Sequence, residues 1–153
     1  MRLRLTLWIA VPALLGAVAL AGAADGKGNP KKITLQARSQ LEQVRIVDTA
    51  PSGRSAGDGL IFTEKLLDAK GTVIGSDAAQ CTALFDQRSL CTGTYLLPGG
   101  QVLVQLLQPS LGGSLTYTQA ITGGTGRYAR ATGTVTVRQR PTGDRFTFRI
   151  RLP

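Results

Sequence analysis

Residues 120–133 read AITGGTGRYARATG, a strand end of aliphatic character that runs into a glycine-rich turn. Gly123, Gly124 and Gly126 allow the chain to turn sharply into the next crossover, and Tyr128 can fold back to plug one end of a barrel. Gly-Gly-Thr-Gly also occurs in phosphate-binding loops, but here no strand-to-helix pattern follows it and no Lys-Ser/Thr closes it. The stretch therefore indicates a structural turn in an all-β protein.

Short runs rich in Thr, Val, Ile, Leu and aromatic residues lie on both sides of this turn, separated by Gly, Pro, Asp and Ser clusters. Repeated short strands with turn signals are typical of an all-β sandwich or barrel. Tight turns are predicted at 68–71, 98–100 and 141–144, and a meander of about eight strands avoids exposed edges by closing. We therefore expect an eight-stranded antiparallel β-barrel. The candidate strands are 33–37, 43–48, 59–67, 72–85 with a bend near Asp77, 89–97, 101–108, 114–121, 132–139 and 145–152.

The N-terminus has the pattern of a cleavable signal peptide. Arg2 and Arg4 precede an apolar run over 5–20, and the small residues at 21–23 predict cleavage after Ala23. A run of about 16 residues is shorter than the roughly 20 that a spanning helix needs. We expect a secreted protein with no membrane anchor in the mature chain. Its parts would be a signal peptide (1–23), a flexible leader (24–32) and a barrel domain (33–153).

Positive charge is concentrated near the C-terminus. Without Arg2 and Arg4 the chain has 16 basic and 9 acidic residues, a net charge of about +7. Seven arginines lie between Arg127 and Arg151, with Asp144 the only acid among them. Two interpretations remain open: the solvated face of a sheet, or attraction to anionic cell-wall polymers or extracellular polysaccharide. In an exported protein, nucleic acid is not the expected partner.

Two cysteines, Cys81 and Cys91, predict one disulfide. An even cysteine count in an exported chain implies a bridge. Residues 78–85 and 89–97 are expected to form a hairpin around a turn at 86–88, which places the two cysteines opposite each other. A metal site has little support in a chain without histidine, and a redox pair has little support without a Cys-x-x-Cys spacing.

Three passages together resemble the allene oxide cyclase-like and dirigent family of β-barrels. The first is 120–133. The second, 57–62, reads GDGLIF and precedes the Asp-x-x-Gly turn at 68–71 and Gly75. The third is the cysteine hairpin, which continues through Gly-Thr-Tyr to Pro-Gly-Gly-Gln at 98–101 and is similar to bacterial members of the group. The passages span most of the chain from Ile33 onward, although the cysteine arrangement differs from that of plant dirigent proteins.

The resemblance implies a calycin-type barrel, often oligomeric, with an apolar cavity. Members with known roles guide the cyclisation, isomerisation or coupling of reactive hydrophobic molecules by orientation, without a metal or organic cofactor. The partner implied is a hydrophobic small molecule, and any enzyme would be a cofactor-independent cyclase or isomerase, or a dirigent-type stereocontrol protein. The residues are compatible with this, because histidine, a serine nucleophile motif and a metal-ligand cluster are all missing. Two alternatives stay open: a non-catalytic carrier or structural barrel, and a cell-wall or matrix polyanion-binding module.

Strand alternation selects the candidate site residues. On 59–67, Leu60, Phe62, Glu64 and Leu66 share one face. A carboxylate on an apolar face is desolvated, which raises its pKa and suits it to acid–base catalysis. The alternative for Glu64 is a surface residue paired with an arginine.

Three tyrosines and one further acid complete the candidates. A phenol can close a pocket and donate a hydrogen bond to a carbonyl or epoxide oxygen. The catalytic candidates are Glu64 and Tyr117. The ligand-binding candidates are Asp58, Phe62, Tyr95 and Tyr128. Two of the three tyrosines are expected to be structural. Asp58 resembles a family acid at a barrel mouth and suits a plain turn equally well.

Alternation also predicts which side chains point inward on two other strands. Phe146, Phe148, Ile150 and Leu152 form an expected inward face, which leaves Arg145, Arg149 and Arg151 outward; the opposite register would make Arg149 a cavity cation. On 101–107, apolar residues occur on both faces. An outward apolar face usually marks a subunit contact, so we expect a homodimer or homotrimer.

Overall fold

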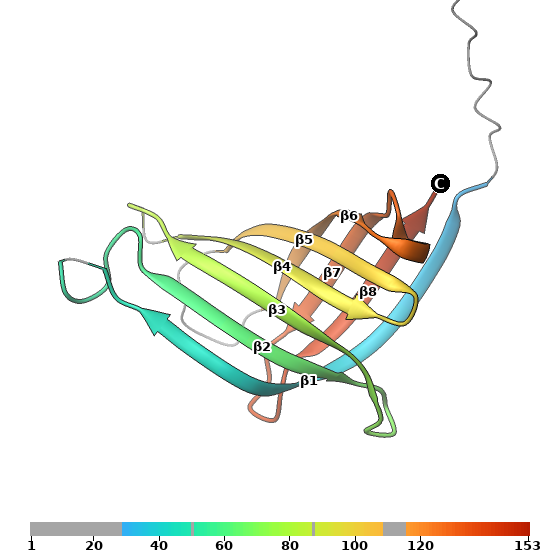
Figure 1. The fold of residues 1–153 in the computed structure, drawn as a ribbon, viewed down its shortest axis with the longest axis horizontal. Helices are drawn as coiled ribbons and strands as arrows, with labels where there is room; N and C mark the ends of the chain where they lie inside the picture. The colour runs from blue at the N-terminus through green and yellow to red at the C-terminus, as the bar shows by residue number, and fades with distance from the viewer. Residues whose placement is uncertain (1–28, 50, 87, 109–115) are drawn as a thin grey trace, which may run out of the picture.

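The computed structural model describes residues 29–49, 51–86, 88–108 and 116–153. Its eight strands form a closed barrel in which each strand pairs with its neighbours along the chain and β1 pairs with β8 (Figure 1). Every pairing is antiparallel, which confirms the predicted fold. The elements are β1 (Lys31–Val47), β2 (Gly59–Leu67), β3 (Val73–Ala83), β4 (Ser89–Leu97), β5 (Gly100–Gln108), β6 (Thr116–Gly124), the 3-10 helix η1 (Gly126–Tyr128), β7 (Thr132–Arg138) and β8 (Arg145–Leu152).

The first two predicted strands, 33–37 and 43–48, are one long strand. β1 pairs with β8 through its first half and with β2 through its second half, and a bulge between Leu41 and Gln43 shifts the register. A bulge lets a strand bend sharply, as a strand shared by two sides of a barrel must. β1 also begins at Lys31, two residues before the expected start, because Lys31 and Lys32 pair with the end of β8.

The glycine-rich turn docks on the β4–β5 hairpin. The backbone N–H groups of Thr125 and Arg127 donate hydrogen bonds to the carbonyl oxygens of Gln101 and Gly99, at 2.9 and 2.8 Å. Gly126 has a φ of 58°, and a Cβ there would collide with the carbonyl oxygen of Gly99. Glycine is therefore required for this close approach. The buried Tyr128 follows and donates a 3.4 Å hydrogen bond to the carbonyl of Pro98, so it plugs this end of the barrel as predicted.

The hydrophobic core fills the end of the barrel that η1 closes, which we call the packed end. Val102, Val135, Phe148 and Ile150 are almost fully buried there. Tyr95 lies edge-on to Phe148, with ring centroids 4.9 Å apart. The predicted inward face of β8 is confirmed, and Arg145, Arg149 and Arg151 are exposed on the outside. The start of β1 and the C-terminus lie near the packed end, whereas the 49–58 loop lies at the other end of the barrel (Figure 1).

Several predictions concern residues that the structure does not describe. The signal peptide (1–23), its cleavage after Ala23, residues 24–28 of the leader and the start of the strand predicted at 114–121 all lie outside the described residues. In the ranges that are described, no helix has the length and apolar character needed to cross a membrane.

Candidate functional site

The half of the barrel away from the packed end is hollow. It contains a cavity of about 200 Å³, which we call the inner cavity. Its wall comes from β1 to β6 and from the segment that joins β7 to β8. Apolar side chains form one part of the wall, and carboxyl, phenol and amide groups form the rest. The wall includes Leu60, Phe62, Glu64, Leu106, Tyr117 and Gln119.

Glu64 and Asp77 are neighbours inside the barrel. They are directly paired residues of β2 and β3, and both side chains are buried, with Glu64 8% and Asp77 6% exposed. Asp77 has the same strand parity as Ala79 and Cys81, which line the inner cavity, so its side chain points inward. Among the described residues, no hydrogen-bond partner satisfies Asp77 Oδ1, and it is buried. Buried polar atoms normally have a partner, so this oxygen is the expected place for a proton, a water molecule or a ligand group.

Burial controls the protonation of these two carboxyl groups. Desolvation raises the pKa of Glu64 to about 7; a hydrogen bond with Ser39 opposes this effect and the charge of Asp144 adds to it. Desolvation, together with the charges of Glu64 and Asp144, raises the pKa of Asp77 to about 7. Burial also raises the pKa of Asp144, a residue of the cavity wall. The Glu64–Asp77 pair therefore holds a proton near neutral pH and can both donate and accept one.

Two tyrosines lie beside the carboxyl pair. Tyr95 is paired with Asp77 across β3 and β4, and its hydroxyl donates a 2.7 Å hydrogen bond to Oε1 of Gln119. Tyr117 lines the inner cavity, and burial raises the pKa of its phenol. Burial likewise raises the pKa of the Tyr95 phenol. Both groups therefore stay protonated, and act as hydrogen-bond donors rather than as bases.

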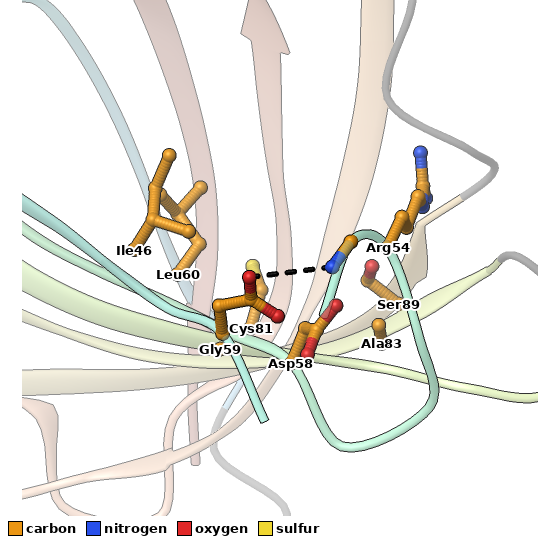
Figure 2. A pocket seen from close by; sticks show the side chains of 10 residues that line it. Ile46, Arg54, Asp58, Gly59, Leu60, Cys81, Ala83 and Ser89 are labelled. Carbon is orange, nitrogen blue, oxygen red and sulfur yellow. Dashed lines mark hydrogen bonds between the residues drawn. The ribbon is translucent and has the colours of Figure 1, made fainter. Parts of the chain in front are cut away.

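A second cavity of about 300 Å³ lies at the open end of the barrel, and we call it the mouth cavity. Leu60 and Cys81 line both cavities, so the two adjoin. Figure 2 shows Ile46 and Leu60 on one side of the mouth cavity and Arg54, from the 49–58 loop, on the other. The 49–58 loop therefore flanks a pocket.

Asp58 organises the loop at the mouth. Its carboxylate accepts hydrogen bonds from the backbone N–H groups of Ser55 and Thr49, at 2.6 and 2.9 Å, and from both hydroxyls. These bonds, led by that from the Ser55 N–H, lower the pKa of Asp58 to about 2. Asp58 therefore remains a carboxylate that fixes the 49–58 loop.

The sequence from residue 38 to 152 matches the family described as the allene oxide cyclase barrel like domain. The match covers most of the chain and the whole of the barrel apart from the start of β1. The chain belongs to this family. None of the curated proteins matches this allene oxide cyclase-like barrel in sequence.

Solved structures share the fold of this allene oxide cyclase-like barrel. One, named pyocyanin demethylase, is 27% identical over 77% of this chain and 99% of its own, with a TM-score of 0.68. A heme-binding cyclase that catalyses [4 + 2] cycloaddition in neoabyssomicin biosynthesis is 18% identical over 88% of this chain and 70% of its own, with a TM-score of 0.64. The Diels–Alderase AbmU from Streptomyces koyangensis is 13% identical over 83% of this chain and 71% of its own, with a TM-score of 0.62.

The structure gathers some of the predicted site residues of this allene oxide cyclase-like barrel and separates others. Glu64, Phe62 and Tyr117 line the inner cavity. Tyr95 lies where the packed end meets the cavity, and Tyr128 lies within the packed end. Asp58 lies at the mouth cavity.

Sequence reasoning missed Asp77, Asp144 and Gln119. The sequence predicts only a strand bend near Asp77. One signal was present: Asp77 and Cys81 are four positions apart on the same strand, so an inward Cys81 implies an inward Asp77. In the described part of the chain, no group of three or more His, Cys, Asp or Glu side chains is arranged to hold a metal ion.

The Cys81–Cys91 disulfide is present and forms part of the cavity wall. It joins directly paired residues of β3 and β4, at a sequence separation of 10. We expect the Cys81→Ala/Cys91→Ala variant to lose about 2–3 kcal/mol of unfolding free energy, the amount that chain-entropy arguments assign to so short a loop. Urea unfolding of both proteins measures the loss. Equal midpoints would show that the bridge adds no stability.

Proposed function

We propose that this protein binds a small, largely apolar molecule in the inner cavity and catalyses a proton-assisted cyclisation or isomerisation of it. The Glu64–Asp77 pair supplies the acid and the base. The observation that carries the proposal is the buried, unpartnered Oδ1 of Asp77 beside Glu64 on the cavity side of β3. Folding gains nothing from two adjacent buried carboxyl groups, because desolvation and like charge both oppose their ionisation. Such a pair is typical of functional sites.

The cavity indicates the kind of molecule. A dry cavity of about 150 Å³ holds benzene, so about 200 Å³ suits a compact ring system or a short folded chain. A longer ligand would extend past Leu60 into the mouth cavity. Leu60, Phe62 and Leu106 offer an apolar wall, while Glu64 and Tyr117 lie on the polar side. An apolar molecule with one oxygen function would therefore bind in a single orientation.

The pair can move protons without any co-reactant. Its protonated member donates a proton to a carbonyl or epoxide oxygen of the ligand, while the carboxylate removes a proton from a neighbouring carbon or hydroxyl. The ligand keeps its composition, and the pair ends with the same number of protons. Tyr117 supports the oxygen with a hydrogen bond. Positioned acid–base groups contribute about 10²–10⁴-fold in rate, and fixed orientation adds to this.

Family membership supports a role of this kind. The similar solved structures include proteins named as cyclases, Diels–Alderases and a demethylase. Their names support a role for this fold in small-molecule chemistry. The support for the carboxyl pair comes from this chain's own residues. The alternative of a non-catalytic carrier would use the same cavity without needing Glu64 or Asp77.

Native mass spectrometry and solvent extraction of the purified protein test the proposal. We expect a bound organic molecule of low mass in the wild type. Ala79→Leu, which projects into the inner cavity, should lose it, whereas Ala78→Leu, on the adjacent outward position, should retain it. The extracted molecule should be converted by the wild type and at least 100-fold more slowly by Glu64→Gln. Equal retention by both leucine variants would contradict binding in the cavity. Full conversion by Glu64→Gln would contradict catalysis by the carboxyl pair, and no conversion by the wild type would leave only the carrier.

We also propose that the protein is exported and acts outside the cytoplasm. The signal-peptide pattern over 1–23 supports this, and so does the disulfide, because disulfides persist in oxidising compartments. Intact mass spectrometry of protein expressed with its native N-terminus tests it. The expected mature chain starts at Ala24, and a chain that keeps residues 1–23 would contradict export.

We further propose that the barrel self-associates through the outer face of β4 and β5. Leu90, Leu96, Leu103 and Leu107 are exposed there, each by more than a third of its surface. We expect light scattering to give the mass of a dimer or trimer and Leu103→Lys to give a monomer, since a lysine in an apolar contact is unfavourable. Thr118→Lys, on the outside of β6, is the matched control and should stay associated. A monomeric wild type at high concentration would overturn this proposal.

A further inference from the structure

One side of the barrel carries six exposed cations in a continuous patch. β8 is flanked by β1 and β7, and the strand registers bring their outward-facing residues together in rows. One row places Arg38, Arg145 and Arg138 directly side by side. The next cationic rows contain Arg149 and the Lys32–Arg151 pair. We call this patch the cationic face: Lys32, Arg38, Arg138, Arg145, Arg149 and Arg151, all exposed.

Folding does not explain this arrangement. Like charges placed directly opposite each other on a sheet are destabilising. The outward positions of β7, β8 and residues 32–38 of β1 contain no acidic residue at all. The salt bridges found among the described residues, Lys65–Glu42 and Arg88–Asp86, involve none of the six. The face therefore concentrates positive charge that an anionic partner would neutralise.

The residues between the cations indicate the class of partner. Apart from Gln36, threonines occupy the intervening outward positions, namely Thr34, Thr132, Thr134, Thr136 and Thr147. Their hydroxyl groups can both donate and accept hydrogen bonds, which matches the hydroxyl groups of sugars. The exposed large apolar side chains of the described residues all lie outside β7, β8 and residues 32–38 of β1, so this face has nothing to insert into a lipid bilayer.

We propose that the cationic face binds a linear, carboxylate-bearing polysaccharide. The arginine guanidinium matches a carboxylate with two parallel hydrogen bonds. Alternate residues on a strand lie about 7 Å apart and neighbouring strands about 5 Å apart, so the patch extends over several sugar units. The barrel wall separates this outer face from the inner cavity. Polymer binding would therefore hold the protein at an extracellular matrix and leave the cavity open.

The experiment measures binding of the mature protein to immobilised alginate, a linear polymer of carboxylated sugars. Neutral dextran, duplex DNA and phosphatidylglycerol vesicles are tested in parallel. The triple variant Arg145→Gln/Arg149→Gln/Arg151→Gln removes half of the cationic face. Arg45→Gln/Lys70→Gln/Arg130→Gln removes the same charge from exposed positions elsewhere. Circular dichroism shows whether each variant is folded.

We expect the wild type to bind alginate and not dextran, with affinity that falls as salt rises. The face variant should bind about 10- to 100-fold more weakly, because three exposed ion pairs are lost, while the control variant should lose less than about threefold. Equal weakening in the two variants would overturn the proposal in favour of net charge alone. Tighter binding to DNA or to the vesicles than to alginate would also overturn it, by assigning the face to that partner.

Discussion

Replacing Phe148 with alanine should cost about 3–5 kcal/mol of unfolding free energy, the range for a large aromatic side chain removed from a packed core. Phe148 is fully buried, and its ring lies 4.9 Å from that of Tyr95, edge to face. The side chains around Phe148 are tightly packed, so they cannot move in to fill the void that the substitution leaves. Urea unfolding at pH 6 gives the value.

Phe62→Ala is the matched control for this prediction. Phe62 is half-buried and lines the inner cavity, so its removal only enlarges an existing space. We expect a loss of about 1 kcal/mol, the transfer free energy of the smaller area that leaves contact. Equal losses for the two variants would contradict the division of the barrel into a packed end and a hollow half.

Asp77→Asn should make the protein more stable at pH 8 by about 1–3 kcal/mol. In the wild type, the pKa of Asp77 is raised from 3.8 to about 7, mainly by desolvation. The folded state then binds more protons than the unfolded state between these values, so the unfolding free energy falls as the pH rises from about 4 to about 7 and levels off above that. Asparagine has no charge to bury and should largely remove this fall.

Thermal unfolding from pH 4.5 to pH 8.5 measures the effect. Glu64→Gln should act in the same direction, since the pKa of Glu64 is raised for the same reason. Asp86→Asn is the control, because Asp86 is exposed and its hydrogen bonds with Arg88 lower its pKa. A wild type whose stability does not change between pH 5 and 8 would show that the carboxyl pair is solvated.

The sequence predicted the barrel because its signals are local. Turn chemistry and strand alternation act over a few residues. They placed β2 to β8, the two halves of β1 as separate strands, the Cys81–Cys91 bridge and the inward face of β8. Glu64 was identified from alternation alone. The bulge between Leu41 and Gln43 was missed, because a single extra residue changes no composition and only the partner strand reveals it.

The division between packed end and cavity could not be predicted. Alternation tells which side of the wall a side chain faces, but not its height along the barrel axis. Phe148 and Phe62 both point inward from strands, yet one lies in the core and the other in the cavity wall. Height depends on how the strands are staggered around the barrel, which is set by long-range pairing. The pairing of Glu64 with Asp77 also depends on long-range strand register, so it could not be predicted either.

The central claim is that Glu64 and Asp77 form a buried pair that holds a proton near neutral pH. NMR titration of protein with ¹³C-labelled carboxyl groups measures this directly. We predict that the Glu64 and Asp77 resonances titrate near pH 7, while Asp58 in the same sample stays ionised down to about pH 2. Titration of both Glu64 and Asp77 near pH 4, the ordinary value for an exposed carboxyl group, would contradict the account.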